Sequence, residues 1–554
     1  MRLAFAVTLF AVVIAITASC SLRQADGPPP SSLPEVRVMS WNIWHGGRED
    51  GAEVGVRKVI DVIASSGADI VAMAETYGSG EAIAQSLGFH FHPRGTNVAL
   101  LSRWPVIEDL SVHEPFQCVG GLIGLPDGRR LAVYSLWLPY DEDIWLPGVR
   151  AGRDSEALRR ACAASARELI SIRDAIDRRL AAEEYAQVPI VIAGDFNSPS
   201  HLDQGEVAID QYGIAVDWAA SEVLARAGYR DAYRECRPVI LRQQDATWSP
   251  RFPQQEQDRI DFVHYRSPRA SPGTWVAKSA DVLREHADGF PSDHAAVLVA
   301  LGRREIPVDG AQVVRAVSYN IHHGEGVDGV LDLDRIAARL ATFQADVIAL
   351  QEVDLGVART ERRNQAAYLA SKLGMHAAFG SFMPYQGGRY GMAVLSRWPL
   401  VAVRSLRLPD GNEPRISLIV DVRLPSDRVL TIADVHFDWV QDDSFRYAQA
   451  QSLVEHLQGR LRDDSPAMLV LGDFNDTPGS RTLDRFREFT LEAPKPIADS
   501  FTFPSTGADR EIDFVFAAPA SRWTPRRVSV ADDPVASDHR PVFAELELRA
   551  PEAR

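Results

Sequence analysis

The segment VRVMSWNIWHGG at 36–47 decides the fold, because the segment VRAVSYNIHHGEG at 314–326 is a near copy of it. Each segment is an apolar run that reaches an asparagine, Asn42 or Asn320, and continues with histidine and glycine. Short runs rich in valine are typical of strands that are buried on both faces. The two copies therefore predict a duplicated domain whose first strand ends near a polar residue.

Five more motif pairs follow these segments, in the same order in both halves of the chain. The pairs are DIVAMAET at 69–76 with DVIALQEV at 346–353, LLSRWPV at 100–106 with VLSRWPL at 394–400, IVIAGDFNSPS at 190–200 with MLVLGDFNDTPGS at 468–480, RIDFV at 259–263 with EIDFV at 511–515, and PSDHAAV at 291–297 with ASDHRPV at 536–542. This period is too long for a solenoid repeat, so it indicates two copies of a whole domain. We predict domain 1 over 36–301, a linker over 302–311 and domain 2 over 312–549.

The first 35 residues predict export. An apolar stretch over 3–18 leads into small residues and Cys20, which is typical of a lipoprotein signal peptide over 1–20. The Pro- and Ser-rich segment 21–35 suits a tether. We expect an extracytoplasmic lipoprotein, periplasmic or on the cell surface, held at a membrane through lipidated Cys20. The alternative is an ordinary cleaved signal peptide and secretion.

The composition excludes several classes of protein. The 554 residues are 46% hydrophobic and carry a formal net charge of −16. Such a chain is neither mainly disordered nor a polytopic membrane protein, and an acidic chain without a basic tract is not a general polyanion binder. Three cysteines remain beyond Cys20, so at most one disulfide joins them.

Strand-like and helix-like segments alternate in both halves, which predicts an α/β fold. Apolar residues recur at helical spacing over 331–343, and we expect further helices over 156–180 and 445–461. The polar motif residues fall where apolar strands end, which is where layered α/β folds place their chemistry.

The polar motif residues form a set rich in oxygen ligands and without thiolates, which suits Mg²⁺ or Mn²⁺ rather than zinc. Paired aspartates and histidines beside such a metal can hydrolyse a phosphate ester. Taken singly, each motif is more often an Asx turn, a helix cap or a satisfied buried carboxylate. The ordered repetition of all of them favours the catalytic interpretation.

The motifs SxN, LQE, LSRWP, GDFN, IDF and SDH resemble the endonuclease/exonuclease/phosphatase superfamily. That superfamily includes apurinic/apyrimidinic endonucleases, pancreatic-type deoxyribonuclease, neutral sphingomyelinases and inositol-polyphosphate phosphatases. The resemblance covers both domains. It implies two four-layered α/β sandwich domains, each with two mixed β-sheets packed face to face and helices outside.

The resemblance also implies a role for each motif residue. In domain 2, the metal ligands would be Asn320, Glu352 and Asp538. Asp473, with Asn475, would orient the attacking water. His539, paired with Asp513, would face the phosphoryl group, and His436 would bind a phosphoryl oxygen. The matching residues of domain 1 are Asn42, Glu75 and Asp293 for the metal, and Asp195, Asn197, Asp261 and His294 for catalysis.

Domain 1 departs from this pattern. Trp137 stands where domain 2 has His436, Phe116 stands opposite Arg415, and Ala74 stands opposite Gln351. Its long insert after GDFN holds four aromatic residues, most of which we expect in the core, with one or two at a pocket mouth. They are Trp218, Tyr229, Tyr233 and Trp248.

These observations predict an extracytoplasmic, metal-dependent phosphoesterase that hydrolyses phosphodiesters or phosphomonoesters, with domain 2 as the more complete site. The substrate is expected to be a lipid head group, a small organic phosphate or nucleic acid, and no obligate protein partner is evident. One alternative is a secreted nuclease. Another is that domain 1 is a non-catalytic ligand-binding module.

Overall fold

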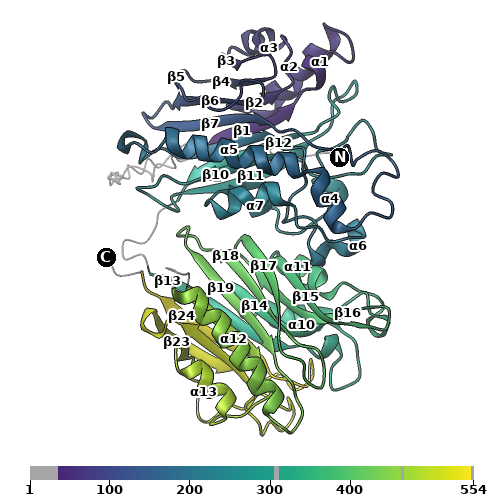
Figure 1. Ribbon diagram of the computed structural model, residues 1–554, viewed down its shortest axis with the longest axis vertical. Helices are drawn as coiled ribbons and strands as arrows, with labels where there is room; N and C mark the ends of the chain where they lie inside the picture. Colours follow the sequence, from purple (N-terminus) through teal and green to yellow (C-terminus); the bar gives the residue numbers. More distant parts are fainter. Residues whose placement is uncertain (1–34, 305–310, 463–466, 551–554) are drawn as a thin grey trace, which may run out of the picture. The chain divides into compact units, whose positions relative to one another are not determined.

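The computed structural model describes residues 35–304, 311–462 and 467–550 (Figure 1). The predicted signal peptide, Cys20 and nearly all of the predicted tether lie outside the described residues. Within the described part of the chain, no helix has the length and apolar character needed to span a bilayer. Both predicted domains are present, and each contains two six-stranded sheets.

Domain 1 is built on two mixed sheets. In the first, strands β1 and β2 are parallel and all other neighbours are antiparallel; in the second, β7 and β8 form the parallel pair. The first sheet has the order β11 (Trp275–Leu283), β12 (Ala296–Arg303), β1 (Val36–Asn42), β2 (Ile70–Ala74), β4 (Val98–Ser102) and β3 (His90–Arg94). The second has the order β5 (Val106–Asp109), β6 (Cys118–Gly124), β7 (Arg130–Trp137), β8 (Ile190–Asp195), β10 (Asp261–Arg266) and β9 (Arg230–Asp231).

Domain 2 repeats this topology. The first sheet has the order β15 (His376–Tyr385), β16 (Gly388–Ser396), β14 (Val347–Leu355), β13 (Gln312–Asn320), β24 (Val542–Leu548) and β23 (Trp523–Val530). The second has the order β17 (Leu400–Arg407), β18 (Ile416–Arg423), β19 (Val429–His436), β20 (Ala467–Asp473), β22 (Asp513–Ala518) and β21 (Leu491–Glu492). Here β13 pairs in parallel with β14, and β19 with β20.

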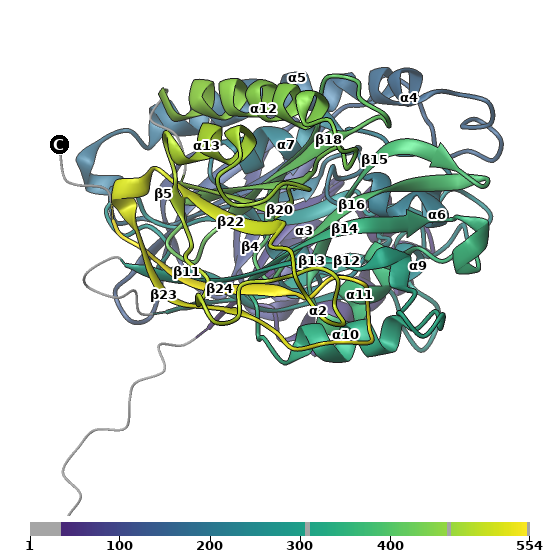
Figure 2. The ribbon, with the colours of Figure 1, turned by 90° about the horizontal axis from the view of Figure 1, so that it is seen from below.

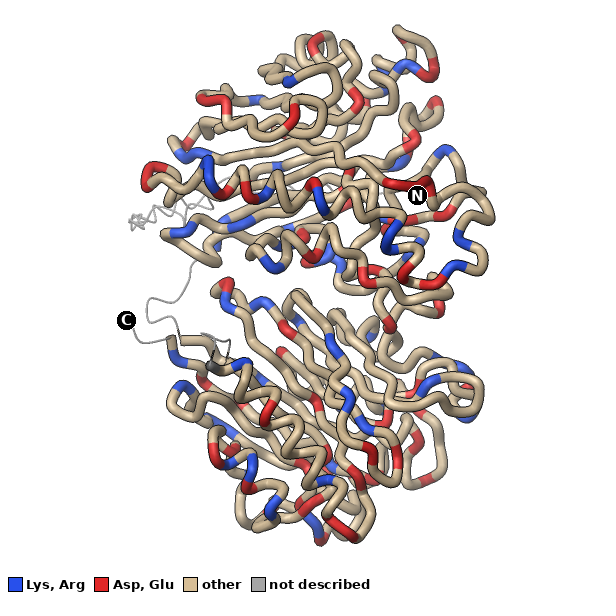
Figure 3. The backbone as a smooth tube through the Cα atoms, viewed as in Figure 1, with Lys and Arg blue, Asp and Glu red and all other residues tan. Residues whose placement is uncertain are grey.

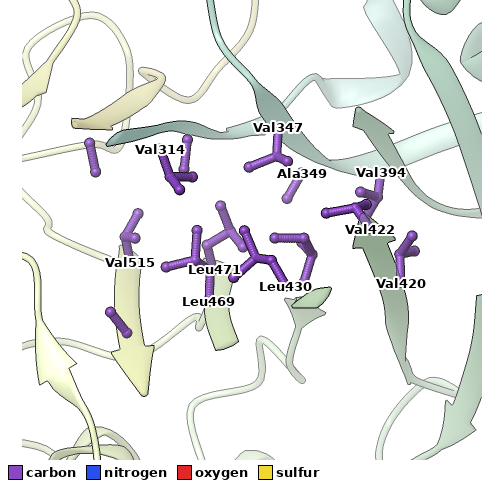
Figure 4. Close-up of a cluster of buried hydrophobic side chains, with 14 of the residues drawn as sticks. Val314, Val347, Ala349, Val394, Val420, Val422, Leu430, Leu469, Leu471 and Val515 are labelled. Carbon is purple, nitrogen blue, oxygen red and sulfur yellow. The ribbon is translucent and has the colours of Figure 1, made fainter. Parts of the chain in front are cut away.

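Alternate side chains of the central strands bury the two faces of each sheet, as the two-residue period of a strand requires. In domain 2, Val314 and Val347 of one sheet meet Leu469 and Val515 of the other in a shared core (Figure 4). Their neighbours along the strands face outward, where Ile348 packs under helices. The sheets therefore pack face to face, as predicted.

Helices cover the outer face of every sheet. In domain 2, α10 (Leu333–Ala341) and α11 (Gln365–Leu373) cover the first sheet, and α12 (Ser444–Arg462) and α13 (Arg481–Arg487) cover the second, on the opposite side of the domain (Figure 2). In domain 1, α2 (Val54–Ser66) and α3 (Gly80–Leu87) cover the first sheet, and α5 (Ala163–Arg179) and α7 (Ala219–Arg226) the second. This confirms the four-layered sandwich.

Two boundaries differ from the sequence prediction. Strand β12 continues to Arg303, two residues past the predicted end of domain 1. The single helix predicted over 156–180 is two helices, α4 (Ser155–Ala161) and α5, which meet at Cys162. They pack on different clusters, since Leu158 lies with Trp145 whereas Leu169 lies under the second sheet, so the chain turns between them. The three described cysteines are free thiols.

Candidate active sites

Strand register brings the predicted site residues together in each domain. Asn42 pairs with Ala74, so Glu75 follows at the same edge of the first sheet, and Asp195 pairs with Asp261 in the second sheet. In domain 2, Asn320 pairs with Gln351 immediately before Glu352, while Asp473 pairs with both Asp513 and His436. The ends of both sheets thus contribute to one site in each domain.

In domain 1, the Asn42 side chain joins the two sheets. Its Nδ2 donates to Glu75 Oε1 at 3.0 Å and to Asp195 Oδ2 at 3.1 Å. His294 Nδ1 lies 2.9 Å from Asp261 Oδ2, and His294 Nε2 lies 3.8 Å from Asp195 Oδ2. A carboxylate that holds one imidazole nitrogen fixes the other nitrogen toward the reacting group.

Domain 2 repeats this geometry. Asn320 Nδ2 donates to Glu352 Oε1 at 3.1 Å and to Asp473 Oδ2 at 3.2 Å. His539 Nδ1 lies 3.0 Å from Asp513 Oδ2, and His539 Nε2 lies 3.6 Å from Asp473 Oδ2. All of these side chains except Glu352 are buried, and Glu352 is partly exposed.

The SDH serines tie Asp293 and Asp538 to these sites. Ser292 donates its hydroxyl to the Asn42 carbonyl at 2.7 Å, and Ser537 donates to the Asn320 carbonyl at 2.8 Å. Each aspartate that follows is thereby held beside the strand that carries the asparagine. In domain 1 the Glu75 charge also reaches Asp293 and acts to raise its pKa.

The GDFN asparagines position the aspartate rather than reach into open space. The backbone N–H of Asn475 donates to Asp473 Oδ1 at 2.9 Å, and its side-chain amide donates to the Phe437 carbonyl at 3.1 Å. Asn197 makes the same backbone bond to Asp195 at 2.9 Å and donates to the Leu138 carbonyl at 2.9 Å. Each asparagine therefore locks the carboxylate that was predicted to orient water.

The two metal-site glutamates sit in constrained backbone. Glu352 lies at the bulge in β14, where the register with β16 shifts, and its φ is 59°. Glu75 has a φ of 57°. Left-handed backbone is costly for a non-glycine residue and concentrates at functional sites. In both domains this conformation turns the carboxylate back toward the asparagine.

Burial and neighbouring charge shift the pKa values of these groups. Burial, opposed by the neighbouring histidine, raises the pKa of Asp195 and of Asp473 to about 7. Burial lowers the pKa of His539, but Asp513 and Asp473 outweigh it and raise the pKa to about 10. Burial also acts to raise the pKa of Glu352, yet His436 and the Asn320 amide hold it at about 2.

The oxygen-rich ends of these sites fit a divalent cation. Asp293 is buried, which raises its pKa to about 6, and its Oδ1 has no hydrogen-bond partner among the described residues. Mg²⁺ and Mn²⁺ take carboxylate and amide oxygens as ligands, and an unpaired buried carboxylate oxygen is open to such a cation. Asp538, the counterpart of Asp293 in domain 2, is partly exposed. The residues that would hold it are Asn42, Glu75 and Asp293 in domain 1, and Asn320, Glu352 and Asp538 in domain 2.

The domains differ where the phosphoryl group is expected. The Arg415 guanidinium is buried, and its Nε and Nη1 have no hydrogen-bond partner in the described chain, while Nη2 lies 2.9 Å from Glu413 Oε2. His436 Nε2 lies 3.6 Å from Asp473 Oδ2, and His436 Nδ1 is buried with no hydrogen-bond partner among the residues that the structure describes. Buried, unpaired donors of this kind are costly unless a ligand satisfies them.

Aromatic rings occupy the corresponding positions of domain 1. Trp137 and Phe116 contact each other edge to face, with ring centroids 5.5 Å apart. Gln351 is different, because its Nε2 donates to the buried Asp434 at 2.6 Å. Its replacement by Ala74 therefore changes a contact between the sheets rather than the phosphoryl side of the site.

The structure adds one aromatic residue to each site. The ring centroid of Trp248 lies 4.9 Å from that of His294, and the ring centroid of Phe503 lies 4.8 Å from that of His539. Thr247 and Thr502, just before these rings, accept the backbone N–H groups of Asp261 and Asp513. The signal in the sequence is TWSP at 247–250 against TFPS at 502–505, a seventh motif pair.

The other aromatic residues of the domain 1 insert belong to the core. Trp218, Tyr229 and Tyr233 are buried, whereas Trp248 lies against His294. This agrees with the expectation that most of the insert aromatics are core and that one or two line a site.

Comparisons with known proteins find relatives that match about half of this chain. The chain is 27% identical over 322 residues to the uncharacterized protein F14F9.5 of Caenorhabditis elegans, which covers 51% of this chain and 96% of that protein. It is 27% identical over 252 residues to the uncharacterized protein YbhP of Escherichia coli K12, which covers 42% of this chain and 96% of that protein.

Solved structures also match part of the chain. An endonuclease/exonuclease/phosphatase from Beutenbergia cavernae is 24% identical and covers 44% of this chain and 73% of its own, with a TM-score of 0.36. The mannosyl-6-phosphatase Bt3783 of Bacteroides thetaiotaomicron is 17% identical and covers 42% of this chain and 99% of its own, with a TM-score of 0.37. The profile of one family matches residues 39–294 and again residues 317–539. The chain therefore belongs to the Endonuclease/Exonuclease/phosphatase family, whose domain it carries twice.

Proposed function

We propose that the protein is a Mg²⁺- or Mn²⁺-dependent phosphoesterase in which domain 2 performs most of the hydrolysis. One observation carries the proposal: the buried Asp473 carboxylate lies between the Asn320–Glu352 pair and the His539–Asp513 pair, with His436 beside it. Arg415 lies near enough to His436 for its charge to lower the pKa of that histidine. A cation bound at Asn320, Glu352 and Asp538 would neutralise charge on the phosphoryl oxygens.

The chain's own residues divide the remaining work. Asp473, held by the Asn475 N–H, orients the attacking water and accepts its proton. Asp513 fixes His539 so that its Nε2 faces Asp473 and the reacting phosphoryl group. Arg415 and His436 donate to phosphoryl oxygens, which satisfies their free nitrogen atoms and stabilises the charge of the transition state.

The charge distribution supports a small or lipid-borne phosphate ester over extended nucleic acid. Basic and acidic residues are interspersed over both domains rather than gathered in a basic stripe (Figure 3). Binding along a nucleic-acid backbone depends on such a stripe. We further propose that the protein acts outside the cytoplasm, anchored through Cys20, where phospholipid head groups and released organic phosphates are at hand.

The matched substitutions Asp473→Asn and Asp195→Asn test this assignment. With a chromogenic phosphodiester and Mg²⁺, we expect Asp473→Asn to lower kcat by roughly 10²-fold or more, because the water loses its general base. Asp195→Asn should change the total rate little, because Trp137 and Phe116 replace the phosphoryl donors of domain 1. Equal losses in both variants would contradict the division of labour, and activity that survives complete chelation would contradict metal dependence.

A further inference from the structure

Two adjacent histidines lie beside the predicted metal ligands of domain 2 and have no role in the proposed hydrolysis. His322 and His323 follow Asn320 in the turn after β13 and have left-handed φ values of 44° and 46°. One ligand atom from each of His322, His323 and Glu352 lies within 4.8 Å of the others. Backbone strain of this kind is stable only when surrounding contacts impose it.

Each of these histidines has one ring nitrogen directed at Glu325 and the other one available. His322 Nδ1 lies 3.0 Å from the Glu325 carbonyl, which accepts only, so this nitrogen carries the proton and Nε2 keeps its lone pair. His323 Nε2 lies 3.6 Å from the Glu325 carboxylate. The His323 side chain is only 9% exposed, and its Nδ1 is buried with no hydrogen-bond partner among the described residues.

This arrangement is that of metal-binding histidines. A ligating imidazole almost always directs its second nitrogen to a carbonyl or a carboxylate, which fixes the tautomer and the orientation of the ring. Here the Glu325 carbonyl is the outer partner of His322, and the Glu325 carboxylate lies 3.6 Å from His323 Nε2. Two imidazoles with one carboxylate favour borderline transition-metal ions, whereas Mg²⁺ prefers oxygen ligands throughout.

We infer that domain 2 binds a divalent transition-metal ion through His322, His323 and Glu352, next to the cation of the proposed function and sharing Glu352 with it. The inference rests on the proposed function for the identity of that neighbouring cation, but not for the binding itself. Two cations joined by one carboxylate would form a binuclear centre of the kind used in phosphoryl transfer.

Domain 1 supplies an internal comparison, because it lacks this ligand set. Trp44 stands in the place of His322, and Gly47 stands in the place of Glu325. His45 corresponds to His323, but its ring is exposed and its Nδ1 lies 2.8 Å from Glu49. We therefore expect one such transition-metal site per chain within the described residues.

The test is Co²⁺ binding to the full chain in excess Mg²⁺, followed by visible absorption and by isothermal titration. We expect one Co²⁺ per chain that Mg²⁺ does not displace, with absorption bands of nitrogen coordination. His322→Trp, which copies domain 1, and His323→Ala should each weaken binding at least tenfold, and Glu325→Gln should weaken it less. His45→Ala is the matched control and should leave Co²⁺ binding unchanged.

Circular dichroism of the metal-free variants shows whether each one folds. Co²⁺ binding that is equal in wild type and in folded His322→Trp and His323→Ala would overturn the inference, and so would a wild type that binds no Co²⁺ in excess Mg²⁺. Mg²⁺-supported hydrolysis is measured in parallel. Hydrolysis without the Co²⁺ site contradicts only this inference, whereas the Co²⁺ site without hydrolysis contradicts only the proposed function.

Discussion

At the scale of single residues, the charge of Glu352 is the property on which the proposed metal site depends. The Asn320 amide and His436 keep its pKa at about 2, so the group is ionised throughout the range in which an enzyme of this kind operates. Glu352→Gln keeps the shape and removes the charge. We expect it to raise the Mg²⁺ concentration for half-maximal activity at least tenfold, as measured by Mg²⁺ titration of hydrolysis. Glu75→Gln in domain 1 is the matched control and should leave that titration nearly unchanged.

Arg415 tests the phosphoryl side of the same site. Its replacement by phenylalanine reproduces domain 1, where Phe116 stands in its place. We expect Arg415→Phe to lower kcat/KM by about 10²-fold, the typical effect of removing one donor to a developing charge. Inorganic phosphate should also inhibit this variant more weakly. Unchanged kcat/KM in a folded variant would show that Arg415 does not contact the substrate.

Some residues of the candidate sites can be identified from the sequence, and others cannot. The asparagines, glutamates, aspartates and histidines of the repeated motifs were predicted, because ordered repetition marks each one twice. The roles that the resemblance implies for them are the ones that the proposed function assigns. The pair His322 and His323 was not predicted, since Trp44 interrupts the pattern and no repetition draws attention to it. The edge-to-face contact of Trp248 with His294 follows from how a long insert folds, which local patterns do not determine.

At the scale of elements, strand β20 depends on Gly472 immediately before Asp473. A Cβ at this position would lie 2.0 Å from the Val435 carbonyl of the neighbouring strand, and the φ of 151° disfavours any other residue. We expect Gly472→Ala to destabilise domain 2 by roughly 2–4 kcal/mol, in the range of mutations that combine overpacking with backbone strain. Thermal unfolding measures this effect. Gly459→Ala, in the exposed part of helix α12 where a Cβ meets no atom within 4 Å, should stabilise by up to about 1 kcal/mol.

The strands were predicted more accurately than the helices, for a physical reason. Runs such as IVIAG at 190–194 are apolar on both faces, and only an internal strand buries both. The break between α4 and α5 has no such signature, because it depends on two clusters that lie far apart along the chain. The helical period continues through Cys162 even though the helix does not.

At the scale of the whole molecule, the predicted membrane anchor determines whether both domains are held at a membrane surface. If Cys20 is lipidated, the wild-type protein should fractionate with membranes and enter the detergent phase. Cys20→Ala should leave it in the aqueous phase or as an unprocessed precursor, with its hydrolytic activity intact. Fractionation and mass spectrometry of the mature amino terminus check this. A mature wild type without an acyl chain would indicate an ordinary signal peptide.

Each site takes its residues from both sheets of a domain. The distances within the site therefore depend on how the two sheets are aligned. Leu469 faces the other sheet (Figure 4). Met468, its neighbour in β20, faces the helices. Truncation of either to alanine should cost about 2–5 kcal/mol of stability. Only Leu469→Ala should also lower kcat well below the melting temperature, because only it allows one sheet to slide over the other. The turnover number of domain 2 would then report a small shift of one sheet relative to the other, which circular dichroism cannot detect.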